Sequence, residues 1–263
     1  MSLLTVKGLS KSFGAVAAAR DVSFEVAAGE LVAMIGPNGA GKSTTFNMVG
    51  GQLKPDRGTI LIDGRSIGGL PARAIWRRGV GRTFQVAQTF VSMSVAENVQ
   101  MALISAHGET RGLWRAARSL HRAQALELLD GVGMRADADR PVSQLAYGDV
   151  KRVELAVALA SEPRLLLMDE PTAGMAPRER AALMELTARI ARERAIGVLF
   201  TEHDMDSVFA HADRILVLVR GEIIAAGRPE EVRANARVKQ VYLGETGVAA
   251  ATRARRAGAA SHA

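Results

Sequence analysis

The chain has 263 residues, 48 % of them apolar, and a formal net charge of +7, so we expect a folded, globular protein of one or two domains. With no cysteine and five scattered histidines, the sequence excludes a disulfide scaffold and a thiolate metal site, and it shows no metal-ligand spacing. It contains neither a run of about eighteen uncharged apolar residues nor a leader pattern, so we expect a cytoplasmic chain without a membrane span or an export signal.

Short β-branched and apolar runs alternate with segments of helical periodicity along much of the chain. This alternation is typical of βαβ units that feed a largely parallel sheet, so the predicted fold class is α/β. Strands are predicted over residues 31–35, 58–62, 164–168, 197–201 and 214–219. A helix over residues 41–49 is predicted to follow the first of these strands.

A glycine-rich segment between that strand and that helix matches the pattern G-x-x-x-x-G-K-[ST]. Glycines let the backbone wrap closely around phosphates, and the amide groups at a helix start face the anion. In this pattern Lys42 supplies a positive charge for the β and γ phosphates, and the Ser43 hydroxyl binds Mg²⁺. A chance glycine-rich turn is the alternative, and the position between strand and helix argues against it. The predicted residues of this Mg-ATP site are Gly36, Pro37, Asn38, Gly39, Ala40, Gly41, Lys42, Ser43 and Thr44.

The positive charge is concentrated between Arg65 and Arg122, where nine arginines and no lysine face two glutamates, a surplus of seven. A basic surface of this kind can contact nucleic acid, anionic lipid or an acidic protein, but arginines on solvated helices are equally ordinary. Charge alone therefore leaves the partner open.

A helical segment occupies the middle of the chain. The sequence Ser-Val-Ala-Glu, from Ser94 to Glu97, is a capping box, and it predicts a helix that runs to about Ile104. From there to about Ala160 the periodicity is almost wholly helical. We expect a helical subdomain over about residues 86–161, set into an α/β core of residues 1–85 and 162–244. Residues 245–263 have little to bury and are predicted to be a disordered tail.

The apolar strand predicted before Asp169 ends in two acidic residues, Asp169 and Glu170. Parallel strands deliver functional groups at their carboxyl ends, and that edge of the sheet also carries the glycine-rich loop. Asp169 would hold Mg²⁺ through water, and Glu170 would polarise the attacking water as a general base. Two such acids can also cap a helix or join a salt-bridged rim. Their pairing with the glycine-rich loop favours ATP hydrolysis.

Four further segments surround these two elements, namely Ser-Phe13-Gly, Arg82-Thr-Phe-Gln85, Leu145-Ala-Tyr-Gly148-Asp149 and Thr201-Glu-His203-Asp. In this order they resemble the adenine-stacking aromatic, the Q-loop, the signature motif and the switch histidine of ABC-type ATPases. The resemblance implies a P-loop NTPase core with a mixed sheet and flanking helices. It also implies a helical subdomain and a small amino-terminal antiparallel β part, all within one ATPase domain over residues 1–244.

The resemblance also implies roles for individual residues. Phe13 and Val16 would stack on adenine, although Phe13 could instead be a core aromatic. Gln85 would bind Mg²⁺ together with Ser43 and Asp169 and report the γ-phosphate to the helical segment, unless it is only a solvated strand end. His203 would hydrogen-bond the γ-phosphate, although a single histidine is more often a surface residue. The implied catalytic residues are therefore Glu170, His203 and Gln85.

The signature segment consists of Leu145, Ala146, Tyr147, Gly148 and Asp149. A loop at a helix start is an anion site, and this one does not belong to the chain's own phosphate loop. The resemblance implies a head-to-tail dimer closed by ATP, in which this loop completes the partner's site. The family pattern has Ser at position 146, Gln at 149 and Asp at 176, where this chain has Ala, Asp and Ala. One hydroxyl contact to the γ-phosphate is therefore absent and a carboxylate stands close to the polyphosphate, while Gly148 and the backbone donors remain.

Three details resemble the ATPases of high-affinity branched-chain amino acid importers. They are Leu-Ala-Tyr-Gly in the signature, Ala-Gly-Met-Ala-Pro after the acidic strand, and the end from Glu231 to Gly244. This resemblance implies a peripheral subunit on the cytoplasmic face of the inner membrane, whose helical segment contacts two permease subunits. It also implies a second ATPase subunit, different or identical, and an extracytoplasmic solute-binding protein that acts indirectly. A soluble ABC ATPase acting on nucleic acid and a regulatory ABC ATPase are the alternatives, and we expect no nucleic-acid partner.

Overall fold

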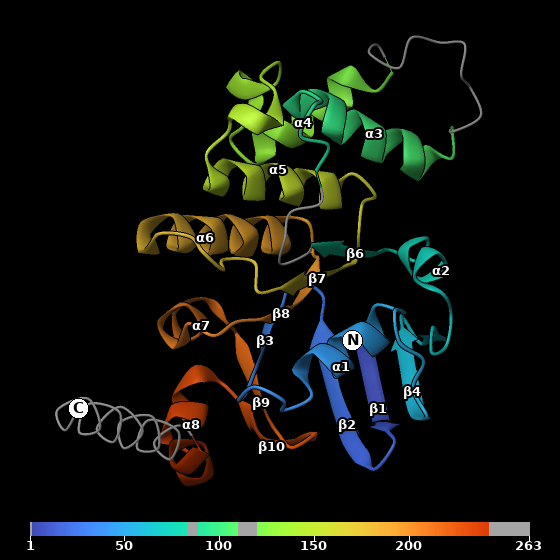
Figure 1. The fold of residues 1–263 in the computed structure, drawn as a ribbon, viewed down its shortest axis with the longest axis vertical. Helices are drawn as coiled ribbons and strands as arrows, with labels where there is room; N and C mark the ends of the chain where they lie inside the picture. The colour runs from blue at the N-terminus through green and yellow to red at the C-terminus, as the bar shows by residue number, and fades with distance from the viewer. Residues whose placement is uncertain (1, 84–88, 110–119, 242–263) are drawn as a thin grey trace, which may run out of the picture.

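The computed structural model of the chain describes residues 2–83, 89–109 and 120–241. These residues form two β-sheets, with a group of helices beyond one end of the larger sheet (Figure 1). The smaller sheet is antiparallel, with the order β2-β1-β4-β5, and consists of β1 (Ser2–Phe13), β2 (Val16–Ala27), β4 (Arg57–Ile62) and β5 (Arg65–Ser66). It is the small amino-terminal β part that the family resemblance implied.

The larger sheet has the order β10-β9-β3-β8-β7-β6. Its strands are β3 (Leu31–Ile35), β6 (Val80–Thr83), β7 (Leu165–Asp169), β8 (Gly197–Thr201), β9 (Arg214–Val219) and β10 (Glu222–Gly227). All neighbouring pairs are parallel except β9 and β10, which form an antiparallel hairpin. The sheet is therefore mixed, as expected for the predicted α/β class.

The helices are α1 (Lys42–Val49), α2 (Ala72–Trp76), α3 (Val95–His107), α4 (Arg122–Gly131), α5 (Tyr147–Leu159), α6 (Pro177–Glu193), α7 (Met205–His211) and α8 (Pro229–Ala234). Of these, α3, α4 and α5 form the helical group above the larger sheet (Figure 1). The predicted capping box opens α3, since Ser94 Oγ accepts from the Glu97 amide at 3.2 Å and Glu97 Oε2 accepts from the Ser94 amide at 2.9 Å. This helix ends at His107, about one turn later than predicted, and its C-cap residue Gly108 has a left-handed φ of 73°.

The prediction of nearly continuous helix up to residue 160 is wrong for residues 132–146. This stretch contains only the short 3-10 turns Arg135–Asp137 and Val142–Gln144 between irregular segments. Gly133 has a left-handed φ of 74°, and Pro141 cannot donate a helical hydrogen bond, so both interrupt the helical path.

The core lies on both faces of the larger sheet. Alternate residues of β3 point to opposite faces, because the side-chain period of a strand is two. Leu31, Ala33 and Ile35 belong to the cluster shared with the helical group, whereas Val32 and Met34 belong to the cluster shared with α1 and the antiparallel sheet. With both faces covered, β3 is buried along its whole length, and the loop that follows it has a rigid support.

The predicted strand bounds are confirmed to within one residue. Strands β3, β8 and β9 begin and end as predicted, β4 begins one residue earlier, and β7 is shifted by one residue so that Asp169 is its last member. The division into core and helical subdomain at residues 85–86 and 161–162 stays a prediction. The predicted tail over 245–263 and Gln85 lie outside the described residues. Within residues 2–83, 89–109 and 120–241, no helix has both the length and the apolar character needed to cross a membrane.

Candidate active site

The glycine-rich loop leaves the carboxyl end of β3 and leads into α1, and two of its glycines are needed because the chain packs closely around them. A Cβ atom on Gly36 would lie 2.1 Å from the carbonyl oxygen of Leu218 in β9. A Cβ atom on Gly41, whose φ is 99°, would lie 2.1 Å from the carbonyl oxygen of Ala18 in β2. Neither position has room for a side chain, so contacts with β9 and β2 fix the path of the loop.

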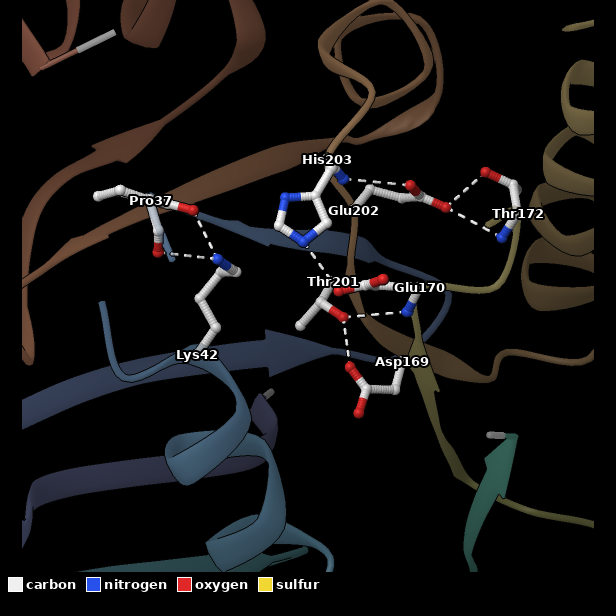
Figure 2. Close-up of polar contacts among 9 residues, drawn as sticks. Pro37, Lys42, Asp169, Glu170, Thr172, Thr201, Glu202 and His203 are labelled. Carbon is white, nitrogen blue, oxygen red and sulfur yellow. Dashed lines mark hydrogen bonds and ion pairs between the residues drawn. The ribbon is translucent and has the colours of Figure 1, made fainter. Parts of the chain in front are cut away.

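Lys42, the first residue of α1, directs its side chain back into the loop (Figure 2). Its Nζ donates hydrogen bonds to the carbonyl oxygens of Gly36 at 2.5 Å and Pro37 at 3.1 Å. No described side chain caps α1, and its first turn contains no acidic residue. The positive end of the helix dipole and the Lys42 ammonium group therefore reinforce each other at one place, which suits a polyanion.

The acidic residues lie at the carboxyl end of β7, beside the end of β8. Asp169 is opposite Thr201 in the parallel register of these strands. The Thr201 hydroxyl donates to Asp169 Oδ1 at 2.7 Å and accepts from the Glu170 amide at 3.0 Å (Figure 2). Glu170 has a left-handed φ of 46°, so the chain turns sharply out of the strand at this residue. Thr201 thus fixes one acidic side chain and the backbone of the other.

Glu170 and His203 are in direct contact although 33 positions separate them in the sequence. Glu170 Oε1 lies 2.8 Å from His203 Nε2, a hydrogen-bond distance (Figure 2). The side chains are 24 % and 51 % exposed, respectively. Both groups can therefore reach a water molecule or a ligand from outside while each orients the other.

Arg82 lies on the other side of Asp169. Its guanidinium is 3.6 Å from Asp169 Oδ2 and donates hydrogen bonds to Asn47 Oδ1 at 2.9 Å and to Gln52 Oε1 at 2.6 Å. Burial lowers the pKa of Arg82, and the negative charge of Asp169 opposes this shift. Arg82 connects α1 and the segment after it to the acidic end of β7. Gln85, which follows β6, lies outside the described residues, so its predicted roles stay predictions.

Two described groups could hold a divalent cation beside bound phosphates. They are the hydroxyl of the exposed Ser43 and the carboxylate of Asp169, which is 24 % exposed. Among the described residues, no cluster of three or more carboxylates, histidines or cysteines could bind a metal by itself. Mg²⁺ commonly takes one or two protein ligands and completes its shell with water and substrate phosphates, so this sparse donor set fits it.

Phe13 and Val16 face each other across the turn between β1 and β2. They are 50 % and 67 % exposed, which is unusual for residues of this size. Ala18, two residues further on, is the residue whose carbonyl oxygen contacts Gly41, so the hairpin packs against the phosphate loop. The predicted adenine-stacking role stays a prediction, and the exposure of Phe13 is compatible with it.

The signature segment lies at the start of α5, within the helical group and away from α1 (Figure 1). Ala146 is the N-cap residue and offers no side-chain cap, Asp149 lies in the first turn, and Tyr147 is 44 % exposed. Leu145 packs against the core, and Gly148 is buried next to Glu179 of α6. The described chain therefore does not bring this segment to its own phosphate loop.

Four polar residues at the site have no individual role in the sequence prediction: Arg82, Thr172, Thr201 and Glu202. Arg82 and Thr201 contact Asp169, while Thr172 and Glu202 contact each other and the loop of His203. The contact of Thr201 with Asp169 follows from their positions as the last residues of β8 and β7, because adjacent parallel strands that end at the same level align their last residues. The order of the strands, which the sequence does not reveal, is needed to use that signal.

Comparison with known proteins gives the same family from sequence and from structure. The family model described as "ABC transporter" matches residues 19–173, and the model described as "Branched-chain amino acid ATP-binding cassette transporter" matches residues 222–248. The structure resembles the crystal structure of the ADP conformation of an ATP-binding cassette of an ABC transporter. The TM-score is 0.83 at 29 % sequence identity, covering 93 % of this chain and 99 % of that one.

Two groups of full-length relatives have nearly the same identity to this chain. The high-affinity branched-chain amino acid transport ATP-binding protein LivG of Escherichia coli is 41 % identical over 253 residues, covering 92 % of this chain and 98 % of LivG. The lipopolysaccharide export system ATP-binding protein LptB of Acidithiobacillus ferridurans is 40 % identical over 243 residues, covering 92 % of this chain and 97 % of LptB.

Proposed function

This chain belongs to the ABC transporter family of ATP-binding cassettes, and we propose that it powers an importer of branched-chain amino acids or related small solutes. As a member of this family it is an ATP-binding subunit and an ATPase. The match of residues 222–248 to the branched-chain amino acid transporter model carries the proposed substrate class. Other amino acids, amides, urea and small aromatic acids are the related solutes.

A lipopolysaccharide export ATPase is the second candidate, because LptB is almost as similar as LivG. A difference of one percentage point in identity does not separate an importer from an exporter. The match of residues 222–248 favours the importer. The nucleic-acid alternative rests only on the arginine-rich stretch 65–122, and affinity for DNA that falls steeply with salt would support it.

The proposed binding step begins at the phosphate loop. The Lys42 ammonium group exchanges the carbonyl oxygens of Gly36 and Pro37 for phosphate oxygens, and the start of α1 donates from its backbone. Phe13 and Val16 stack on the adenine. Ser43, Asp169 and Gln85 would hold Mg²⁺, which would supply positive charge against the phosphates.

The proposed hydrolysis uses the contact between Glu170 and His203. Glu170 accepts a proton from a water molecule as the water oxygen attacks the γ-phosphorus, and the bond from this phosphorus to the leaving ADP oxygen breaks. His203 is 2.8 Å from Glu170, where its ring can orient the carboxylate and hydrogen-bond the γ-phosphate. The products are ADP and inorganic phosphate.

We further propose that two ATPase chains, identical or different, close head to tail around ATP. The segment from Leu145 to Asp149 would then complete the partner's site, because in the described chain it lies away from its own loop. The subunit would lie on the cytoplasmic face of the membrane, bound to two permease subunits, and a solute-binding protein outside would act through those permeases.

A transport assay tests the proposed substrate class. Cells that lack this chain should regain uptake of radiolabelled leucine when the wild-type chain is expressed, but not with Glu170→Gln. Lipopolysaccharide at the cell surface should be normal in both strains. Unchanged leucine uptake together with lost lipopolysaccharide export would overturn the importer in favour of the second candidate.

A further inference from the structure

Glu202 is a buried acidic residue between Thr201 and His203, and its side chain is only 4 % exposed. Its carboxyl group accepts three hydrogen bonds (Figure 2). Oε1 accepts from the amide of Thr172 at 3.0 Å and from the Thr172 hydroxyl at 2.6 Å. Oε2 accepts from the amide of His203 at 3.2 Å. A buried carboxyl group is costly unless such donors surround it, so its presence here needs an explanation.

The two hydrogen bonds with Thr172 join the two loops that carry the proposed catalytic pair, and the third lies within the loop of His203. Thr172 lies two residues after Glu170 in the loop that follows β7, and His203 lies in the loop that follows β8. Thr201 already holds the Glu170 amide at 3.0 Å from the sheet side. The hydrogen bonds between Glu202 and Thr172 form a second connection, two residues after Glu170. The two loops are therefore joined at residues next to the proposed catalytic pair.

We propose that Glu202 is a positioning residue for ATP hydrolysis. By binding Thr172 and the His203 backbone, it keeps the Glu170 carboxylate and the His203 ring at their 2.8 Å separation. Because Thr172 is only 1 % exposed, water does not compete for these bonds. The inference rests on the proposed roles of Glu170 and His203.

The chemistry of the site calls for a carboxyl group rather than an amide. All three partners are donors, and they approach both oxygens of Glu202. A glutamine has one acceptor oxygen and one NH₂ donor, so Glu202→Gln places a donor against either Thr172 or the His203 amide. The substitution keeps the size of the side chain while it breaks one of the two connections.

The first test compares kinetics with nucleotide affinity in the purified full-length chain. Glu202→Gln should lower kcat about tenfold, as loss of a supporting hydrogen bond does elsewhere, while affinity for a fluorescent ATP analogue stays within about twofold of wild type. Thr172→Val should lower kcat in the same direction, and Thr172→Ser should restore it. Glu222→Gln is the matched control, because Glu222 is exposed on β10 and should leave kcat unchanged.

The second test separates positioning from general support of the fold. In a His203→Ala background, Glu202→Gln should lower kcat less than about twofold, because residues that act as one unit are not additive. If Glu202 only stabilised the protein, the tenfold loss would persist in that background. The thermal unfolding midpoint of each variant would then fall in parallel with its activity.

Four outcomes are decisive. Wild-type kcat in a well-folded Glu202→Gln variant, or equal tenfold losses with and without His203, would overturn the inference. If Glu202→Gln does not fold, the kcat of Thr172→Val relative to Thr172→Ser decides instead, and equal values overturn it. Undiminished hydrolysis by Glu170→Gln would contradict the proposed catalytic assignment itself, and is therefore distinguishable from failure of the Glu202 inference alone.

Discussion

The starts of α1 and α5 are two glycine-containing helix beginnings that differ in what surrounds them. Neither has a side-chain cap among the described residues, in contrast to α3, which Ser94 caps. The start of α1 carries Lys42 and no acid in its first turn. The start of α5 carries Asp149 in its first turn, and its first residue, Tyr147, is exposed.

This difference separates a helix start with a positive side chain from one with negative side chains around it. Arg82 links α1 to Asp169 at the end of β7, so the proposed binding and hydrolytic groups lie together in one chain. The start of α5 instead has Asp149 in its first turn and Glu179 of α6 next to Gly148, and these negative charges oppose an approaching polyphosphate. A helix start thus becomes a strong anion site only where the rest of the fold adds the right charges.

The largest effect is expected from Glu170→Gln, which removes the proposed base beside α1. Hydrolysis should slow at least about 100-fold, because a positioned general base contributes on this scale, while ATP affinity remains near wild type. Steady-state ATPase assays and a fluorescent nucleotide titration measure the two quantities. Glu222→Gln serves as the matched control. A variant that still hydrolyses ATP at the wild-type rate would remove Glu170 from the mechanism.

Lys42→Ala should weaken ATP binding about 10- to 100-fold, because it removes a charged hydrogen-bond donor to phosphate. Isothermal titration calorimetry with ATP measures the change directly. Lys239→Ala, at an exposed lysine, is the control for loss of one positive charge. Unaltered affinity would mean that the phosphates are not bound by this loop.

Asp149→Asn tests the α5 side of the comparison. Removal of this negative charge should favour ATP-dependent dimerisation about two- to fivefold, since a charge in the first helical turn contributes modestly. Sedimentation velocity with ATP, in a Glu170→Gln background that retains nucleotide, reports the dimer fraction. The charge-matched control is Asp130→Asn, at an exposed residue of α4. An equal increase in dimer fraction for the Asp130→Asn control would mean that Asp149 has no specific role at the dimer interface.

The smallest effect is expected from Ala146→Ser, which supplies the missing cap of α5. A serine at the N-cap should raise the free energy of unfolding by about 0.5 kcal/mol. Urea denaturation measures this change, and Ala234→Ser, at the last residue of α8, controls for the added hydroxyl. A stability gain confined to Ala146→Ser would show that the start of α5 lacks a side-chain cap that a serine can supply, and an equal gain in the control would contradict this.

Local features of the site could be predicted from the sequence because their signals lie within a few residues. The glycine-rich loop, the Ser94–Glu97 capping box and the acidic end of β7 each combine a short pattern with a neighbouring strand or helix. Strands β3, β7, β8 and β9, which are short and mostly buried, were predicted to within one residue. The irregular structure of residues 132–146 was not predicted, because helical periodicity in short stretches does not reveal where glycine and proline interrupt a helix.

Local sequence patterns are enough to identify the groups that the chain carries: a glycine-rich loop with Lys42, two acids at a strand end, and a histidine after a later strand. Which of these groups are in contact depends on the tertiary structure. Strand β8 lies next to β7, so Glu170 meets His203, Thr201 meets Asp169, and Glu202 reaches Thr172. Strand order depends on packing between segments far apart in the chain, and no local pattern encodes it.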